Sequence, residues 1–147
     1  MKPTWHAILG AVFTFLFWIL FPATPLLCLA LIFLSSVFID LDHYINAIMR
    51  NGSISPINMI AYYKKVGDKM DRDHARGIRK KEPDFQFFHT AEVFAVVFIL
   101  GFVWAGFFYI LIGMVLHIIL DLIRMAAIDQ MYSREFFLAN WLAKQMS

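Results

Sequence analysis

The chain has 147 residues, of which 61% are hydrophobic and 16% are charged, and its mean hydropathy is +0.66. A typical soluble domain is about 45–50% apolar and about 25% charged, so the composition excludes an ordinary soluble protein and indicates a membrane protein with one domain. The formal net charge of +2 is unremarkable, and we expect no nucleic-acid partner.

Residues 5–42 form the first almost continuous apolar stretch. A single helix of this length would run roughly 57 Å, about twice the thickness of the hydrocarbon core of a bilayer. Pro22 and Pro25 mark the reversal, because proline removes a helical N–H and clashes with the preceding turn. We therefore predict membrane-spanning helices at about 5–21 and 26–43.

A polar stretch, 44–87, follows these two spans. Ser55-Pro56 is typical of an N-cap followed by the first helical residue. We expect a surface helix from 56 to about 66 and a second, charged helix over 68–81.

Residues 88–126 form a second apolar stretch that is again too long for one span. Gly106 lies between aromatic residues and is the predicted turn, which places spans at about 88–105 and 107–125. In the tail, 129–147, bulky apolar side chains are interspersed with polar ones. This pattern predicts an amphipathic helix on the membrane surface.

The lysines and arginines predict the orientation in the membrane. Nine of the 13 lie in the polar stretch 44–87, and the other four fall at or beyond span ends on the same side: Lys2, Arg124, Arg134 and Lys144. The positive-inside rule then places this loop and both termini in the cytoplasm. The expected fold is an all-α, multi-pass protein of the cytoplasmic membrane, with four transmembrane helices, a cytoplasmic loop and a C-terminal interfacial helix.

Histidine and acidic residues gather at the cytoplasmic ends of all four expected spans. In chain order they are His6; Asp40, Asp42 and His43; His89 and Glu92; and His117 and Asp121. Ionisable groups inside a bilayer are costly and usually functional. The i, i+4 spacing puts His117 and Asp121 on one helix face. Asp42 lies about 200° from Asp40 on an ideal helix, so it joins the others only if the helix loosens there.

Imidazole and carboxylate groups together suit Zn, Mn or Fe. Six or more candidate ligands exceed the needs of one tetrahedral zinc, so one ion and two ions are both open. Each residue also has a simpler interpretation. His6 and His43 could be interfacial side chains, Asp121 could pair with Arg124, and Glu92 could complement the dipole of its helix. We expect His74, in a charged run, to be solvated.

These span ends carry four ordered motifs: Trp5-His6-Ala7-Ile8-Leu9-Gly10, Asp40-Leu41-Asp42-His43, Phe88-His89-Thr90 and His117-x-x-x-Asp121. In this order the motifs resemble those of the membrane-bound metal-dependent hydrolase family of bacteria and archaea. The resemblance covers nearly the whole chain. It implies metal ligands at His6, Asp40, Asp42, His89, His117 and Asp121, with His43 as a ligand or the neighbour of one.

The chain departs from that family where the family has His-Arg before a Thr-His-Ser motif. Here the corresponding residues are Asp84-Phe85, and the motif reads Phe88-His89-Thr90. Asp84 could replace the histidine as an oxygen ligand. The positive charge that would bind substrate could come from one of three residues, Arg79, Lys80 or Arg124.

The leading hypothesis is a metal-dependent hydrolase at the cytoplasmic interface that acts on a membrane lipid or another phosphoester. It would use one or two divalent ions, Zn first and Mn or Fe as alternatives, with Glu92 as general base. The basic loop would attract an anionic headgroup. A metal-stabilised membrane scaffold without activity is the main alternative. A transporter is less favoured, because the outer halves of the spans carry no charge.

Overall fold

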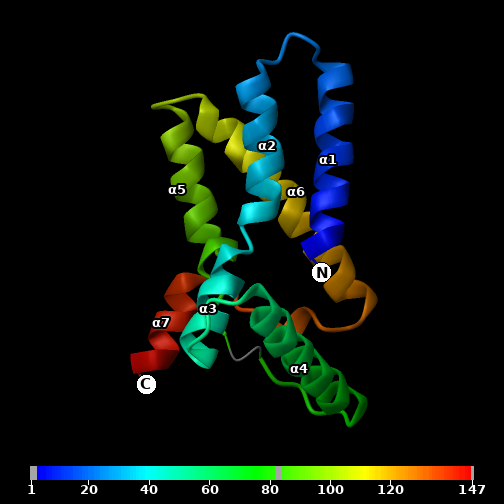
Figure 1. Cartoon of the computed structure of the whole chain (residues 1–147). Coiled ribbons are helices and arrows are strands. Elements are labelled where there is room, and N and C mark those ends of the chain that lie inside the picture. The colour runs from blue at the N-terminus through cyan, green and yellow to red at the C-terminus, as the bar shows by residue number, and fades with distance from the viewer. Residues whose placement is uncertain (1–2, 82–83, 147) are drawn as a thin grey trace.

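The computed structural model describes residues 3–81 and 84–146, and all regular secondary structure in these ranges is helical (Figure 1). Two 3₁₀ turns, η1 and η2, lie among the α-helices. The elements in chain order are α1 (Pro3–Leu20), α2 (Leu26–Phe38), α3 (Leu41–Asn51), α4 (Pro56–Ala75), η1 (Phe87–His89), α5 (Ala91–Gly101), α6 (Gly106–Ala127), η2 (Met131–Ser133) and α7 (Leu138–Met146). The predicted all-α class is confirmed.

The apolar helices α1, α2, α5 and α6 lie at one end of the molecule, and α3, α4 and α7 lie at the other (Figure 1). In the apolar part, α2 packs against α1 and α6, and α6 also contacts α5 and α1. Small residues bring these helices close together. A Cβ at Gly113 of α6 would meet the backbone of α2 at Ile32, and a Cβ at Gly10 of α1 would meet Ser36. This close packing sets the distance between α2 and the side chains that lie one turn further along α6.

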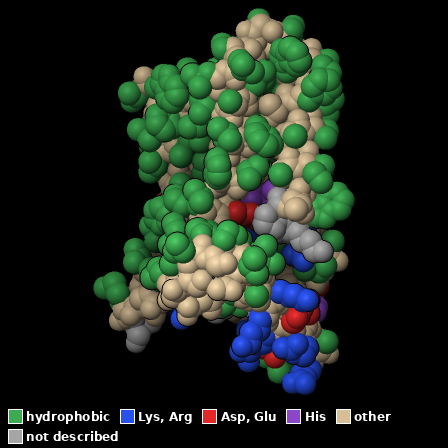
Figure 2. Space-filling view, viewed as in Figure 1, with side chains coloured by type: hydrophobic (Ala, Val, Ile, Leu, Met, Phe, Trp, Pro, Cys, Tyr) green, Lys and Arg blue, Asp and Glu red, His purple; other side chains and the backbone are tan. Residues whose placement is uncertain are grey.

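Two segments of the described chain are long and apolar enough to cross a membrane. They are Leu26–Asn51, which comprises α2 and α3, and Gly106–Ala127, with hydropathies of 1.9 and 2.3. Helices α1 and α5 are apolar but shorter. Hydrophobic side chains cover the end built from α1, α2, α5 and α6, whereas Lys, Arg, Asp and Glu gather at the opposite end, around α4 (Figure 2). A large exposed apolar surface of this kind favours contact with lipid.

The second apolar helix does not continue to residue 43 as predicted. α2 ends at Phe38, and α3 begins at Leu41 after a bend at Ile39 and Asp40. The bend turns Asp42 inward, where its carboxylate accepts a hydrogen bond from the N–H of Phe88 at 3.1 Å. The helix is therefore interrupted at the position that allows Asp42 to face the same side as Asp40.

Two other boundaries also differ from the prediction. One helix, α4, replaces the two helices expected over 56–66 and 68–81, because Gly67 alone weakens a helix by only about 0.5–1 kcal/mol. Pro56 begins α4 as expected, but the side chain of Ser55 makes no capping hydrogen bond. Gly106 is the first residue of α6 and not the turn. Its missing side chain leaves room for the ring of Trp104, which a Cβ would strike.

Candidate metal centre

Histidine and aspartate side chains from α1, from residues 40–43 at the α2–α3 bend, from η1 and from α6 meet at the base of the apolar helices. They form three overlapping groups whose ligand atoms lie within 4.8 Å of one another: Asp40, Asp42, His43 and His89; His6, Asp40 and His117; and His89, His117 and Asp121. The seven histidine and aspartate residues expected at the span ends each belong to at least one group: His6, Asp40, Asp42, His43, His89, His117 and Asp121. Such a group could hold a metal ion.

The deeper part of the cluster lies between α1 and α6. His117 is fully buried, and its Nε2 lies 3.3 Å from Asp40 Oδ1 and 3.6 Å from Asp121 Oδ2. The rings of His6 and His117 stack with centroids 3.8 Å apart. His117 Nδ1 lies 2.8 Å from the carbonyl oxygen of Ser36, which can only accept a hydrogen bond. Nδ1 therefore carries a proton, and Nε2 is the ring nitrogen that would bind a metal.

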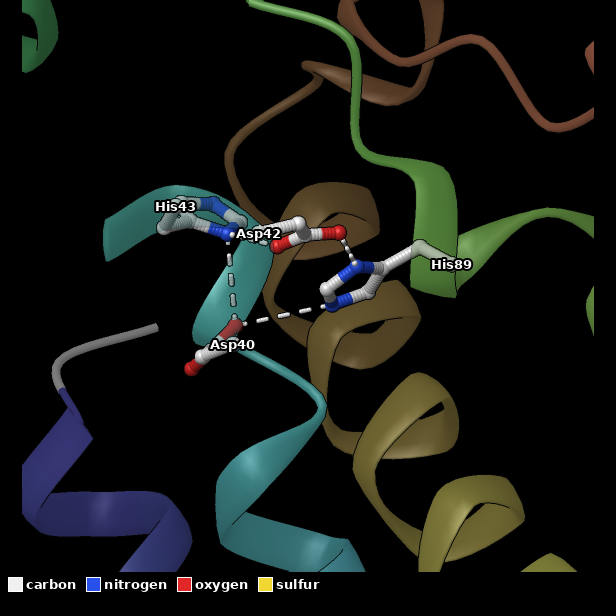
Figure 3. Close-up of side chains that lie close together, drawn as sticks. All are labelled: Asp40, Asp42, His43 and His89. Atoms are coloured by element: carbon white, nitrogen blue, oxygen red, sulfur yellow. Dashed lines mark hydrogen bonds and ion pairs between the residues drawn. The ribbon is translucent and has the colours of Figure 1, made fainter. Parts of the chain in front are cut away.

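The outer part of the cluster is built around Asp42 (Figure 3). One carboxylate oxygen lies 2.8 Å from His43 Nδ1, and the other lies 2.9 Å from His89 Nδ1. Asp42 thereby orients the ring of His89 so that its Nε2 lies 3.5 Å from Asp40 Oδ1 and 3.3 Å from His117 Nε2. A carboxylate that holds the far nitrogen of a histidine in this way is a common partner of metal ligands.

The buried polar atoms of the cluster fit a cation. Both ring nitrogens of His6 are buried without a hydrogen-bond partner within the described part of the chain, although Nε2 lies 3.2 Å from Asp121 Oδ1. Nε2 of His117 and Nε2 of His89 also face each other at 3.3 Å. A metal ion would satisfy these lone pairs and neutralise the carboxylates. His43 and Asp40 are the more accessible members, with side chains 23% and 19% exposed.

Arg134 reaches the cluster although no motif marks it. Its Nη2 lies 2.8 Å from Asp121 Oδ2, and the side chain is 6% exposed. Its Nε and Nη1 are buried and have no hydrogen-bond partner among residues 3–81 and 84–146. Its position depends on the chain folding back after α6 through η2, which leaves no local signal in the sequence.

The carboxylate of Glu92 contacts the backbone at the start of α7. Its two carboxylate oxygens accept hydrogen bonds from the N–H groups of Leu138 at 2.9 Å and Ala139 at 3.1 Å. Glu92 therefore satisfies the free N–H groups at the start of α7. It belongs to none of the three groups of candidate ligands in the described chain. Its contacts are those of a helix-capping residue, and its role as general base stays a prediction.

Asp84 is also placed away from the candidate ligands. It is buried, and its carboxylate accepts hydrogen bonds from Arg50 Nε at 3.1 Å and from the hydroxyl of Tyr62 at 2.8 Å. Burial and this carboxylate raise the pKa of Tyr62 to about 12. The ring of Tyr63 lies 5.0 Å from that of His43, so these residues border the candidate metal centre.

The three predicted substrate-binding cations lie elsewhere. Arg79 is exposed and pairs with Asp129 at 3.1 Å. Lys80 is exposed and pairs with Asp73 at 3.5 Å, and Arg124 is exposed on α6. The buried cation at the cluster is Arg134.

No family model, no curated protein and no solved structure matches the chain. The resemblance to the hydrolase family thus stays a prediction from four short motifs, and the function has to be argued from the geometry of the cluster.

Proposed function

We propose that the chain is a membrane-embedded, metal-dependent hydrolase that acts at the cytoplasmic interface on a phosphoester or a membrane lipid. The observation that carries the proposal is the convergence of three overlapping His/Asp groups from four separate elements. Isolated ionisable residues near lipid would be expected to turn toward water. These residues instead turn toward one another, and His6, His117 and Asp121 are at most 3% exposed.

The overlap of the groups favours two ions. Asp40 belongs to the group that contains Asp42 and to the group that contains His6, so it would contact an ion on each side. Bound metal would polarise a phosphoryl or acyl oxygen and lower the pKa of water towards 7. The chain's own contribution is positional, because Asp42 orients His89 and the Ser36 carbonyl fixes the tautomer of His117. Because Glu92 hydrogen-bonds to the start of α7, a carboxylate of the cluster would accept the proton in its place.

The position of the cluster supports action at a membrane surface. Acidic and histidine side chains are visible at the boundary between the apolar and the charged ends (Figure 2). We propose that α1, α2, α5 and α6 all cross the bilayer. Because α5 has 11 residues, it would span only about 16 Å, so the membrane would be locally thin or completed by the flanking turns. The basic loop would then lie in the cytoplasm.

Fusions of a reporter to Thr24 and to Met70 test this topology. Thr24 lies in the turn between α1 and α2, and Met70 lies on α4. We expect the two fusions to report opposite sides of the membrane, with Met70 in the cytoplasm. The same side for both would refute the proposed crossing of α1 and α2.

Turnover by purified protein tests the activity. We expect hydrolysis of a phosphomonoester such as p-nitrophenyl phosphate, or of phosphatidic acid in mixed micelles. The rate should fall by more than about 100-fold on chelation or in Asp40→Asn, because the loss of an outer partner of a ligand alone costs about 10–100-fold. Stoichiometric metal without turnover of either substrate, and a lower Tm on chelation, would instead identify a metal-stabilised scaffold.

A further inference from the structure

Arg134 is a buried cation, and most of the hydrogen-bond donors of its guanidinium group have no acceptor within the described chain. Within the described part of the chain, its Nη2 pairs with Asp121, while Nε and Nη1 are buried without hydrogen-bond partners. Burying a guanidinium without satisfying its donors is costly. Arginine at such a position is typical of sites that bind carboxylate or phosphate oxygens.

A pocket of about 150 Å³ lies beside Arg134. Its lining includes Lys81, Ser133, Arg134, Glu135, Trp141 and Lys144. On one side Phe85 and Trp141 stack with ring centroids 4.5 Å apart, which gives this pocket a rigid aromatic edge. The pocket therefore combines a polar lining with a fixed wall, and Arg134 connects it to the candidate metal centre through Asp121.

The charges of the lining favour an anion once metal is bound. Lys81 and Lys144 lie 3.4 and 2.6 Å from the carboxylate of Glu135, and Lys81 also donates to the carbonyl oxygen of Arg134 at 3.0 Å. Asp84 is already paired with Arg50. If Asp121 gives its charge to a metal ion, as the proposed function requires, the positive charge of Arg134 is left without a full counter-charge. An anionic group in the pocket would restore the balance.

We propose that this pocket binds a phosphate group of the substrate, with Arg134 as the residue that selects it. The inference rests on the proposed function and deepens it, since it assigns the substrate to the phosphoesters. Arg134 is a specificity-determining residue here. Lys81 and Lys144, which are about half exposed, lie at the polar lining and can attract the anion from solution.

Isothermal titration calorimetry on the full-length, metal-loaded protein in detergent tests this inference. The probes are inorganic phosphate and phosphatidic acid in mixed micelles. Arg134→Gln should weaken phosphate binding at least about tenfold, and Arg134→Lys, which keeps the charge but loses donors, should weaken it less. Arg72→Gln is the matched control, because it removes one positive charge from an exposed position on α4 and should leave affinity unchanged.

Unchanged affinity for both probes in Arg134→Gln and Arg134→Lys would overturn the proposal, as would a failure of the wild-type protein to bind either probe. Tighter binding of phosphatidic acid would identify a lipid headgroup, and tighter binding of inorganic phosphate a water-soluble ester. If Arg134→Gln does not fold, Arg134→Lys carries the test. If the protein binds no metal but still binds phosphate through Arg134, the hydrolase proposal is refuted and the phosphate-binding pocket is supported. If turnover depends on metal but phosphate affinity does not depend on Arg134, the hydrolase proposal is supported and the phosphate-binding pocket is refuted.

Discussion

The packing of α6 against α2 makes Gly113 the position where one methyl group should disturb the metal centre. A Cβ at Gly113 would lie against the carbonyl oxygen of Ile32 and the hydroxyl of Ser35, and 3.0 Å from the backbone nitrogen of Ser36. The hydroxyl can rotate away, but the backbone atoms cannot. Gly113→Ala must therefore push the two helices apart.

The structure sets the size of this effect. Restoring ordinary contact distances requires a shift on the order of 1 Å, and overpacking of this kind costs about 1–3 kcal/mol. At this chain length, that corresponds to a decrease in Tm of about 3–10 °C. His117 lies one turn after Gly113 and donates to the Ser36 carbonyl at 2.8 Å. The same shift would stretch this hydrogen bond beyond its usual range and lower metal affinity by about 10–100-fold.

Thermal unfolding in detergent and a competition titration for metal measure the two effects. Gly67→Ala is the matched control, because it is the same change on α4 with nothing within 4 Å of the new Cβ. It should raise stability by about 0.5–1 kcal/mol and leave metal affinity unchanged. Equal Tm and metal affinity in Gly113→Ala and wild type would refute the close α2–α6 packing and its link to His117.

Three further predictions concern single side chains. His117→Ala should lower metal affinity by more than about 100-fold, whereas His74→Ala should not, because His74 contacts Tyr132 outside the cluster. If elemental analysis finds the same loss of metal in both variants, the site has been assigned to the wrong residues. Glu92→Gln should leave metal content unchanged and speed hydrogen exchange in α7. A loss of metal in this variant would instead identify Glu92 as a metal ligand. Since the pKa of Tyr62 is raised to about 12, its stabilising contact should persist below pH 10 and be lost between about pH 10 and 12; Tyr62→Phe should remove this dependence of Tm, and an unchanged profile would argue against it.

The sequence predicts the broad fold because apolar length and proline act locally. Pro22 and Pro25 separate α1 from α2 as expected. The bend at Asp40 is different, since neither glycine nor proline occurs there. It is held by contacts of Asp42 with residues 88 and 89, which are distant in sequence. Helical periodicity could show only that Asp40 and Asp42 lie on different faces of a regular helix, so that a bend is required to bring them together.

The same contrast applies to the site. Histidine and aspartate stand out because they are costly among apolar residues, so the candidate ligands are visible in the sequence. Glu92 shares that signal, but its partner is the start of α7, a contact that spacing cannot predict. Arg134 lies in a polar tail where arginine is ordinary. Its burial against Asp121 follows only from the folded arrangement of η2 and α6.

The metal content of the purified protein tests the proposal of a metal-dependent hydrolase most directly. We expect elemental analysis to find one or two Zn, Mn or Fe ions per wild-type chain and few or none in Asp40→Asn, because Asp40 belongs to two of the three groups of candidate ligands. A wild-type chain that folds and takes up no stoichiometric metal, even after incubation with Zn²⁺, would contradict it.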